Sequence, residues 1–126
     1  PWEGSIDLQM FAACNARFIG GGYPIAPGAL IDDGMLDVLV VPRMPLLEFI
    51  GVLQRIASGS STEVPGVRHF LASSFDLVLD RPIRVNTDGE LLEATRCEYR
   101  VHRSAVQFFC GDAPHASAPG LPGLRA

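Results

Sequence analysis

Residues 75–109, FDLVLDRPIRVNTDGELLEATRCEYRVHRSAVQFF, are typical of an antiparallel β structure. Short apolar and β-branched runs predict four strands, at 75–79, 83–86, 98–102 and 105–109. The Arg-Pro pair at 81–82 is expected to interrupt the first two strands. The tetrapeptide TDGE at 87–90 predicts a tight turn, since Asp-Gly is a strong signal for a β-hairpin.

Upstream of this segment the sequence predicts two more strands and one helix. Apolar residues alternate with a period of two across 6–14, and 35–41 is a buried, β-branched run. The helix is predicted at about residues 46–58, where apolar side chains recur at helical spacing, at Leu46, Ile50, Leu53 and Ala57. Pro45 suits its first turn and Gly59 its C-terminal cap. We therefore expect a mainly β fold, an antiparallel β-sandwich with one inserted α-helix.

The composition is that of an ordinary globular domain and excludes several functional classes. The chain has 126 residues, 48% of them apolar, which suffices for about one domain with its own core. A net charge of −4 without a basic face argues against binding of nucleic acid through phosphate neutralisation. No apolar run approaches the ~20 residues that cross a bilayer, and the N-terminus lacks a signal-peptide pattern.

Residues 1–110 are expected to form the β domain, and residues 111–126, rich in Pro, Gly, Ala and Ser, a disordered tail. Because the chain begins at Pro1 and not at Met, we expect it to be trimmed or to be part of a longer protein. The sequence contains three cysteines, Cys14, Cys97 and Cys110. Their odd number and the absence of CxxC spacing predict reduced thiols in a cytosolic protein, without disulfides or a zinc site.

Two turn segments carry carboxylates that could support chemistry. Asp32, Asp33 and Asp37 lie within six residues, and hard cations such as Mg²⁺ take oxygen ligands from loops of this kind. Asp88 and Glu90 would project from the predicted hairpin turn, where a carboxylate could accept a proton from a substrate hydroxyl or meet a metal bound to phosphate. Spacing alone favours the simpler alternatives, a solvated Asp-Gly turn and a plain hairpin turn.

The remaining motifs give little chemical signal. The glycine triplet at 20–22 precedes extended chain and no helix, so a phosphate-binding loop is excluded and a structural bend is expected. The histidines show no helical ligand spacing: His69, His102 and His115. No nucleophile-elbow pattern supports hydrolase chemistry.

Taken together, the motifs resemble the C-terminal domain of the bacterial diacylglycerol kinase family, which includes sphingosine kinases and other soluble lipid kinases. The resemblance runs from about residue 8 to residue 109. It is carried by motifs in a fixed order: NARFIGGG at 15–22, IAP at 25–27, DDGMLDV at 32–38, PGV at 65–67 and DGE at 88–90. No single motif is specific, but the ordered set is.

The resemblance implies a two-domain enzyme whose N-terminal α/β domain binds ATP through a Gly-Gly-Asp-Gly-Thr type motif. This chain has no such motif. It therefore resembles the substrate-side domain of an ATP-dependent lipid kinase without its nucleotide-binding domain. The implied reaction is phosphorylation of a lipid hydroxyl, with diacylglycerol to phosphatidic acid as the first candidate, and the isolated chain is expected to be inactive.

The resemblance also implies two sites. Asp88 would be the catalytic base that takes the proton from the lipid hydroxyl, and Glu90 would assist by orienting groups or contacting metal. A structural Mg²⁺ would be held by the Asp33 carboxylate and the main-chain carbonyls of Leu30 and Met35. This ion would order the loop and would differ from the ion on ATP.

The expected partners are a lipid substrate and ATP, the latter through the absent domain, and no nucleic acid. The expected location is cytoplasmic and peripheral to the membrane, although no amphipathic basic helix marks a membrane contact. The resemblance implies further sandwich strands before residue 8, which we expect to be absent from this chain. An edge left open in this way could promote homo-oligomerisation.

Two alternatives stay open. The chain could be a non-catalytic lipid- or partner-binding β-sandwich module, which sequence upstream would distinguish because a kinase needs the glycine-rich nucleotide domain. It could also belong to a relative that acts on a non-lipid alcohol, as the distantly similar NAD kinases do. Assays with presented lipids would decide between these substrates.

Overall fold

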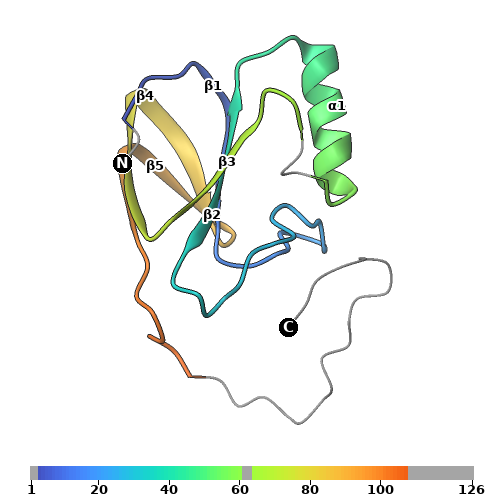
Figure 1. Ribbon diagram of the computed structural model, residues 1–126. Helices are drawn as coiled ribbons and strands as arrows, with labels where there is room; N and C mark the ends of the chain where they lie inside the picture. The colour runs from blue at the N-terminus through green and yellow to red at the C-terminus, as the bar shows by residue number, and fades with distance from the viewer. Residues whose placement is uncertain (1–2, 61–63, 108–126) are drawn as a thin grey trace.

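The computed structural model describes residues 3–60 and 64–107, and this part of the chain is mainly β (Figure 1). Its elements in order are β1 (Leu8–Cys14), β2 (Leu36–Pro42), α1 (Leu46–Ala57), β3 (Arg68–Ala72), β4 (Ser74–Thr87) and β5 (Glu90–Arg100). Strands β1, β2 and β3 form an antiparallel sheet with β2 in the centre, and β4 and β5 form an antiparallel hairpin. The predicted fold class is confirmed.

Strand β2 is the centre of the core because its apolar run is buried on both faces. Residues 37–41 are all buried, as a strand covered from two sides requires. Leu39 and Val41 belong to one cluster with Val52 and Ile56 of α1. Helix α1 therefore covers one face of the three-stranded sheet.

Helix α1 lies where the sequence predicts it, and ends at Ala57, one residue earlier than expected. Gly59 adopts a φ of +81°, which few residues other than glycine tolerate. Its N–H donates to the Ile56 carbonyl at 2.9 Å, and the N–H of Ser60 donates to the Arg55 carbonyl at 2.9 Å. These two bonds form a Schellman cap, which ends the helix at this point.

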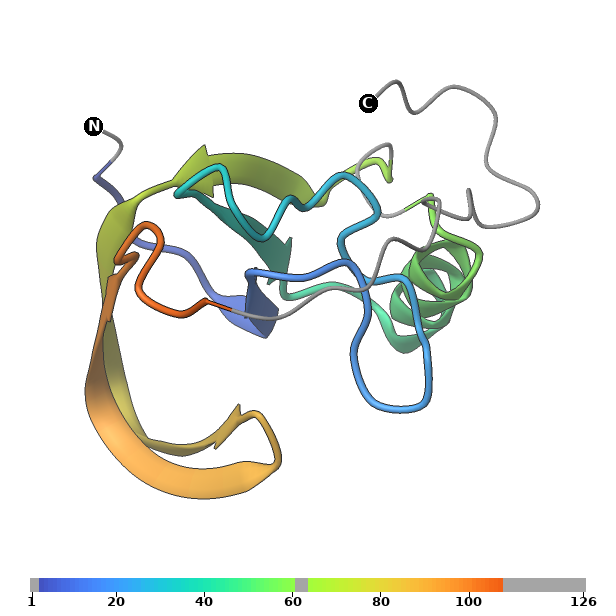
Figure 2. The ribbon, with the colours of Figure 1, turned by 90° about the horizontal axis from the view of Figure 1, so that it is seen from below.

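The interruption expected at the Arg-Pro pair 81–82 is wrong, because β4 runs without a break from Ser74 to Thr87. The pairing register with β5 shifts between Val78 and Ile83, so the ladder is irregular around the proline. A bulge tolerates proline because the extra residues there need no ladder hydrogen bond. Figure 2 shows the hairpin bent into a wide arc.

Two other strand predictions need correction. The segment 98–102 is predicted as a separate strand, but residues 98–100 are the end of β5, which starts at Glu90, and residues 101–102 lie beyond it. The strand expected at 105–109 is absent from residues 105–107. Residues 108–109 and the expected tail at 111–126 lie outside the described residues. Strand β3 was not predicted, because Arg68–Ala72 is too short and too mixed to show alternation.

The hairpin meets the three-stranded sheet at an aromatic cluster. The ring of Phe75 stacks on that of Tyr99 with centroids 4.5 Å apart, and Phe11 of β1 lies 5.7 Å from Phe75 and 6.0 Å from Tyr99. One residue, Ser73, joins β3 to β4, and its carbonyl accepts a hydrogen bond from Val101 N–H at 2.9 Å. The base of the hairpin is thus fixed to the sheet.

Candidate functional site

The turn of the β4–β5 hairpin presents the two predicted catalytic carboxylates. Asp88 and Gly89 both have positive φ, +50° and +101°, as a type I′ turn requires. The N–H of Gly89 donates to Asn86 Oδ1 at 2.8 Å, and the Thr87 hydroxyl donates to the Glu90 carbonyl at 3.3 Å. The backbone is therefore well determined, while Asp88 and Glu90 are exposed and make no ion pair with a described residue.

The loop before β2 holds the predicted metal ligands. Asp33 Oδ1 accepts a hydrogen bond from the Met35 N–H at 2.8 Å, and Gly34 between them has a φ of +77°. This bond fixes the carboxylate beside the main chain and leaves Oδ2 available. Asp33 makes no ion pair within the described residues, and carboxylate and carbonyl oxygens are the donors that a hard cation prefers. The donor set fits Mg²⁺.

The third carboxylate of this segment lies elsewhere. Asp37 is buried in β2, and its Oδ1 lies 2.7 Å from His69 Nε2 of β3. Of the three neighbouring aspartates, only Asp32 and Asp33 thus belong to the loop. Within residues 3–60 and 64–107, no group of three or more His, Cys, Asp or Glu side chains could hold a metal ion.

The structure keeps the two predicted sites apart. In Figure 2 the loop before β2 lies in the upper part of the view, level with β3, and the hairpin turn lies at the bottom. The glycine triplet, which precedes both sites in the sequence, forms a closed bend with two backbone hydrogen bonds of 3.0 Å between Ile19 and Tyr23. That bend agrees with the structural role expected for the triplet.

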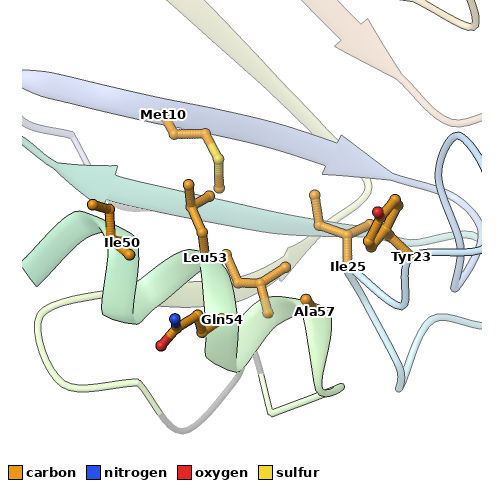
Figure 3. A pocket seen from close by; sticks show the side chains of 8 residues that line it. Met10, Tyr23, Ile25, Ile50, Leu53, Gln54 and Ala57 are labelled. Carbon is orange, nitrogen blue, oxygen red and sulfur yellow. The ribbon is translucent and has the colours of Figure 1, made fainter.

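An apolar pocket that the sequence did not reveal lies between α1, β1 and the bend (Figure 3). Its volume is about 390 Å³. Apart from the Tyr23 hydroxyl and the Gln54 amide its lining is apolar, from Met10, Ile25, Ile50, Leu53, Ile56 and Ala57. Such a lining can take an apolar chain, and offers few groups for a polar ligand.

The apolar residues at helical spacing in the sequence include two residues of this pocket, Ile50 and Leu53, but they do not mark the side of α1 that is buried in the core. Leu46, Ile50 and Leu53 are exposed, and the helix buries Val52 and Ile56, which are not part of that pattern. Two apolar faces on one helix indicate a second contact besides the core.

The Cys14 thiol lies in the core next to Asp37. Burial, and secondly the negative charge of the nearby Asp37, raise the pKa of this thiol from its ordinary 9.0 to about 11. Because the folded state holds the proton up to a higher pH than the unfolded state, the thiol stabilises the fold fully below pH 9. That stabilisation is lost as the pH rises towards 11.

We expect the free energy of unfolding, measured in urea, to decline between pH 8 and 11. The Cys14→Ala variant should lack part of this decline. Cys97→Ala is the matched control, since Cys97 lies half-buried in the hairpin, and it should keep the decline. Burial, and secondly the neighbouring Cys97, also raise the pKa of Tyr99, which adds a second decline at higher pH; Cys97→Ala weakens this second decline and keeps the one due to Cys14. The assignment fails if the free energy of unfolding falls with pH equally steeply in Cys14→Ala and the unmodified protein.

Comparison with known proteins adds independent information. Residues 4–110 match the family described as YegS C-terminal NAD kinase beta sandwich-like domain. The chain is similar to three proteins, each named probable lipid kinase YegS-like. It is 30% identical to one from Shewanella frigidimarina over 117 residues, 34% identical to one from Stenotrophomonas maltophilia over 95 residues, and 35% identical to one from Xanthomonas axonopodis pv. citri over 91 residues.

These alignments cover most of this chain and a minor part of each relative. They include 86%, 74% and 71% of the chain, but only 38%, 30% and 28% of the three relatives, in the same order. The chain therefore spans about a third of the length of the curated relatives it matches. In the part of the chain that the structure describes, no helix is long and apolar enough to span a membrane.

Proposed function

The chain belongs to the YegS C-terminal NAD kinase beta sandwich-like domain family, and on this premise we propose that it is the substrate-side domain of an ATP-dependent lipid kinase. The reaction we propose is phosphorylation of a lipid hydroxyl, with diacylglycerol as the first substrate to test. The names of the relatives support a lipid kinase without naming the lipid.

The observation that carries the proposal is the exposed carboxylate of Asp88, which stands on the hydrogen-bonded backbone of the hairpin turn. In the proposed step Asp88 accepts the proton of the lipid hydroxyl while the hydroxyl oxygen attacks the γ-phosphorus of ATP. The bond to the β,γ-bridging oxygen breaks, and ADP leaves. Positioning and charge neutralisation dominate such reactions. Glu90, two residues on and also exposed, would orient the reacting groups.

The apolar pocket supports a lipid over a water-soluble alcohol. Its lining beside α1 would shield one hydrocarbon chain from water. The same pocket could serve a non-catalytic lipid-binding module, which is the second candidate. The nucleotide would bind to the part of the protein that this chain does not cover, so the isolated chain is expected to be inactive.

The experiment that tests the function is ATP-dependent phosphorylation of a lipid panel by the whole protein. The panel should contain diacylglycerol, a sphingoid base and phosphatidylglycerol. Transfer of labelled phosphate to one of them would establish the kinase and its substrate class. Binding of lipid by the folded protein without any transfer, in the presence of Mg²⁺, would favour the non-catalytic module.

For the loop before β2 we propose a structural Mg²⁺ held by the Asp33 carboxylate and the carbonyls of Leu30 and Met35. When bound, the ion would supply positive charge that orders the loop. We expect Asp33→Ala to lower the melting temperature by a few degrees, as loss of about 1 kcal/mol would, and to abolish its dependence on Mg²⁺. Asp32→Ala, one residue away and exposed, is the control.

The readout is thermal melting with Mg²⁺ and with chelator. The unmodified protein and Asp32→Ala should both melt at a lower temperature in chelator, and Asp33→Ala should not respond. If chelator leaves the melting temperature of the unmodified protein unchanged, the loop holds no ion.

A further inference from the structure

Helix α1 carries more apolar surface than its packing uses. Val52 and Ile56 are buried in the core, and Phe49 packs against it. Four other apolar side chains form what we call the outer stripe, namely Leu46, Leu47, Ile50 and Leu53, exposed by 71%, 84%, 42% and 41%. A helix on the surface of a soluble domain usually places polar residues there. The outer stripe therefore indicates a contact with an apolar partner.

The outer stripe is continuous with the apolar pocket. Ile50 and Leu53 belong to both, and Figure 3 shows Leu53 pointing from α1 towards Met10 of β1. Tyr23, which is 58% exposed, lies at the far end of the pocket. An aromatic side chain with a polar tip suits the boundary between hydrocarbon and water. A hydrocarbon chain could pass from the outer stripe into the pocket while remaining on apolar surface.

The charges around the outer stripe differ in sign from those of the whole chain. Residues 42–60 contain Arg43, Arg55 and Glu48 as their charged side chains, which gives +1, whereas the chain carries −4. Both arginines are exposed. Arg43 precedes α1 and Arg55 lies in its last turn, so an exposed arginine stands near each end of the helix, which complements a membrane surface that contains anionic lipids.

We propose that the outer stripe docks on a lipid bilayer, with Leu46 and Leu47 entering the hydrocarbon boundary and the pocket opening towards the membrane. The inference rests on the proposed function in one respect, that the pocket receives a chain of the lipid substrate. Helix α1 has few charges, so burial of apolar area contributes most of the binding. This mode of binding is consistent with the lack of a basic amphipathic helix in the sequence.

The test uses the whole protein and vesicles of phosphatidylcholine and phosphatidylglycerol in co-sedimentation. We expect the Leu46→Gln/Leu47→Gln double variant to lower the partition constant at least about tenfold, because two leucines no longer leave water. The matched control is Leu71→Gln/Val78→Gln, which alters exposed apolar side chains of β3 and β4. This control should bind within about twofold of the unmodified protein, as isolated surface changes usually do.

A second measurement reports insertion directly. Leu47→Trp should gain fluorescence quenching from bilayers with brominated acyl chains, and Val78→Trp should not. Unchanged vesicle binding in the double variant, together with a lower melting temperature, would overturn the proposal and show that the outer stripe packs on another part of the protein. Absence of quenching at Leu47→Trp would also overturn it.

Kinase assays separate this inference from the proposed function. We expect the ratio of activity on vesicle-borne diacylglycerol to activity on a short-chain, water-soluble diacylglycerol to fall in the double variant. If the unmodified protein phosphorylates the soluble lipid but both forms bind vesicles equally, the docking proposal fails and the function stands. If binding depends on Leu46 and Leu47 but no lipid is phosphorylated, the function fails and docking stands.

Discussion

Replacement of Asp88 by asparagine in the whole protein is expected to lower kcat for lipid phosphorylation about a thousandfold, within the range that loss of a general base produces. Asparagine has nearly the same shape as aspartate but cannot accept the hydroxyl proton. It also tolerates positive φ, so the turn at +50° should keep its conformation. The melting temperature should therefore stay within a degree or two of the original.

The matched control is Asp80→Asn, an exposed aspartate of the same hairpin in β4. Both variants lose one negative charge, so a general electrostatic effect would appear in both. Initial rates at saturating ATP and lipid give kcat for each. If Asp88→Asn turns over within about tenfold of the unmodified protein, Asp88 is not the base. An equal fall of kcat in the two variants would indicate that the loss of a negative charge, and not the loss of a proton acceptor, lowers the rate.

Leu39→Ala is expected to lower the free energy of unfolding by about 3 kcal/mol, typical of a leucine removed from a well-packed core. Leu39 is 2% exposed in the central strand and packs in the same cluster as Val52 and Ile56 of α1. This loss has two parts: the removed atoms no longer contribute their free energy of transfer from water, and a cavity is left between the sheet and the helix. Because this cluster joins α1 to the sheet, the position of the helix, and with it the shape of the pocket, should become less well fixed.

Urea unfolding at neutral pH measures this loss, with Leu71→Ala as the control of equal size. Leu71 lies in the edge strand β3 and is 53% exposed, so its truncation should cost less than about 1 kcal/mol. Equal losses at the two positions would contradict the packing of α1 on β2. A fluorescent fatty acid should also bind less well to Leu39→Ala, if the pocket depends on this cluster.

The sequence predicts the elements whose pattern is local. The Asp-Gly turn at 88–89, the buried run of β2 and the helix at 46–57 each follow from spacing within a few residues, and the structure has all three. The catalytic and metal roles of Asp88, Glu90, Asp33, Leu30 and Met35 come from the family resemblance. They stay predictions, because side-chain geometry alone does not identify a base or a ligand.

The features that the sequence missed depend on contacts between distant residues. Which stripe of α1 faces the core is decided by the sheet beneath it, so periodicity identified the helix but not its buried face. The pairing of Asp37 with His69 joins residues 32 positions apart, and no local pattern indicates it. The continuous strand β4 likewise requires knowledge of β5, because the bulge opposite the proline exists only in the paired sheet.

The attachment of the hairpin has a consequence for how Asp88, the proposed catalytic base, is held. Beyond the rings of Phe11, Phe75 and Tyr99, β4 continues to Thr87, a contour of ~40 Å at ~3.3 Å per residue. The hairpin is thus attached to the sheet at the aromatic rings and carries Asp88 at its free end. Because the hairpin is bent into a wide arc (Figure 2), the straight distance from the rings to Asp88 is shorter than this contour, but a small tilt at the rings would still displace the end of the hairpin. Alignment of Asp88, the proposed proton acceptor, with a hydroxyl would therefore depend on how Phe75 packs on Tyr99, far from the carboxylate.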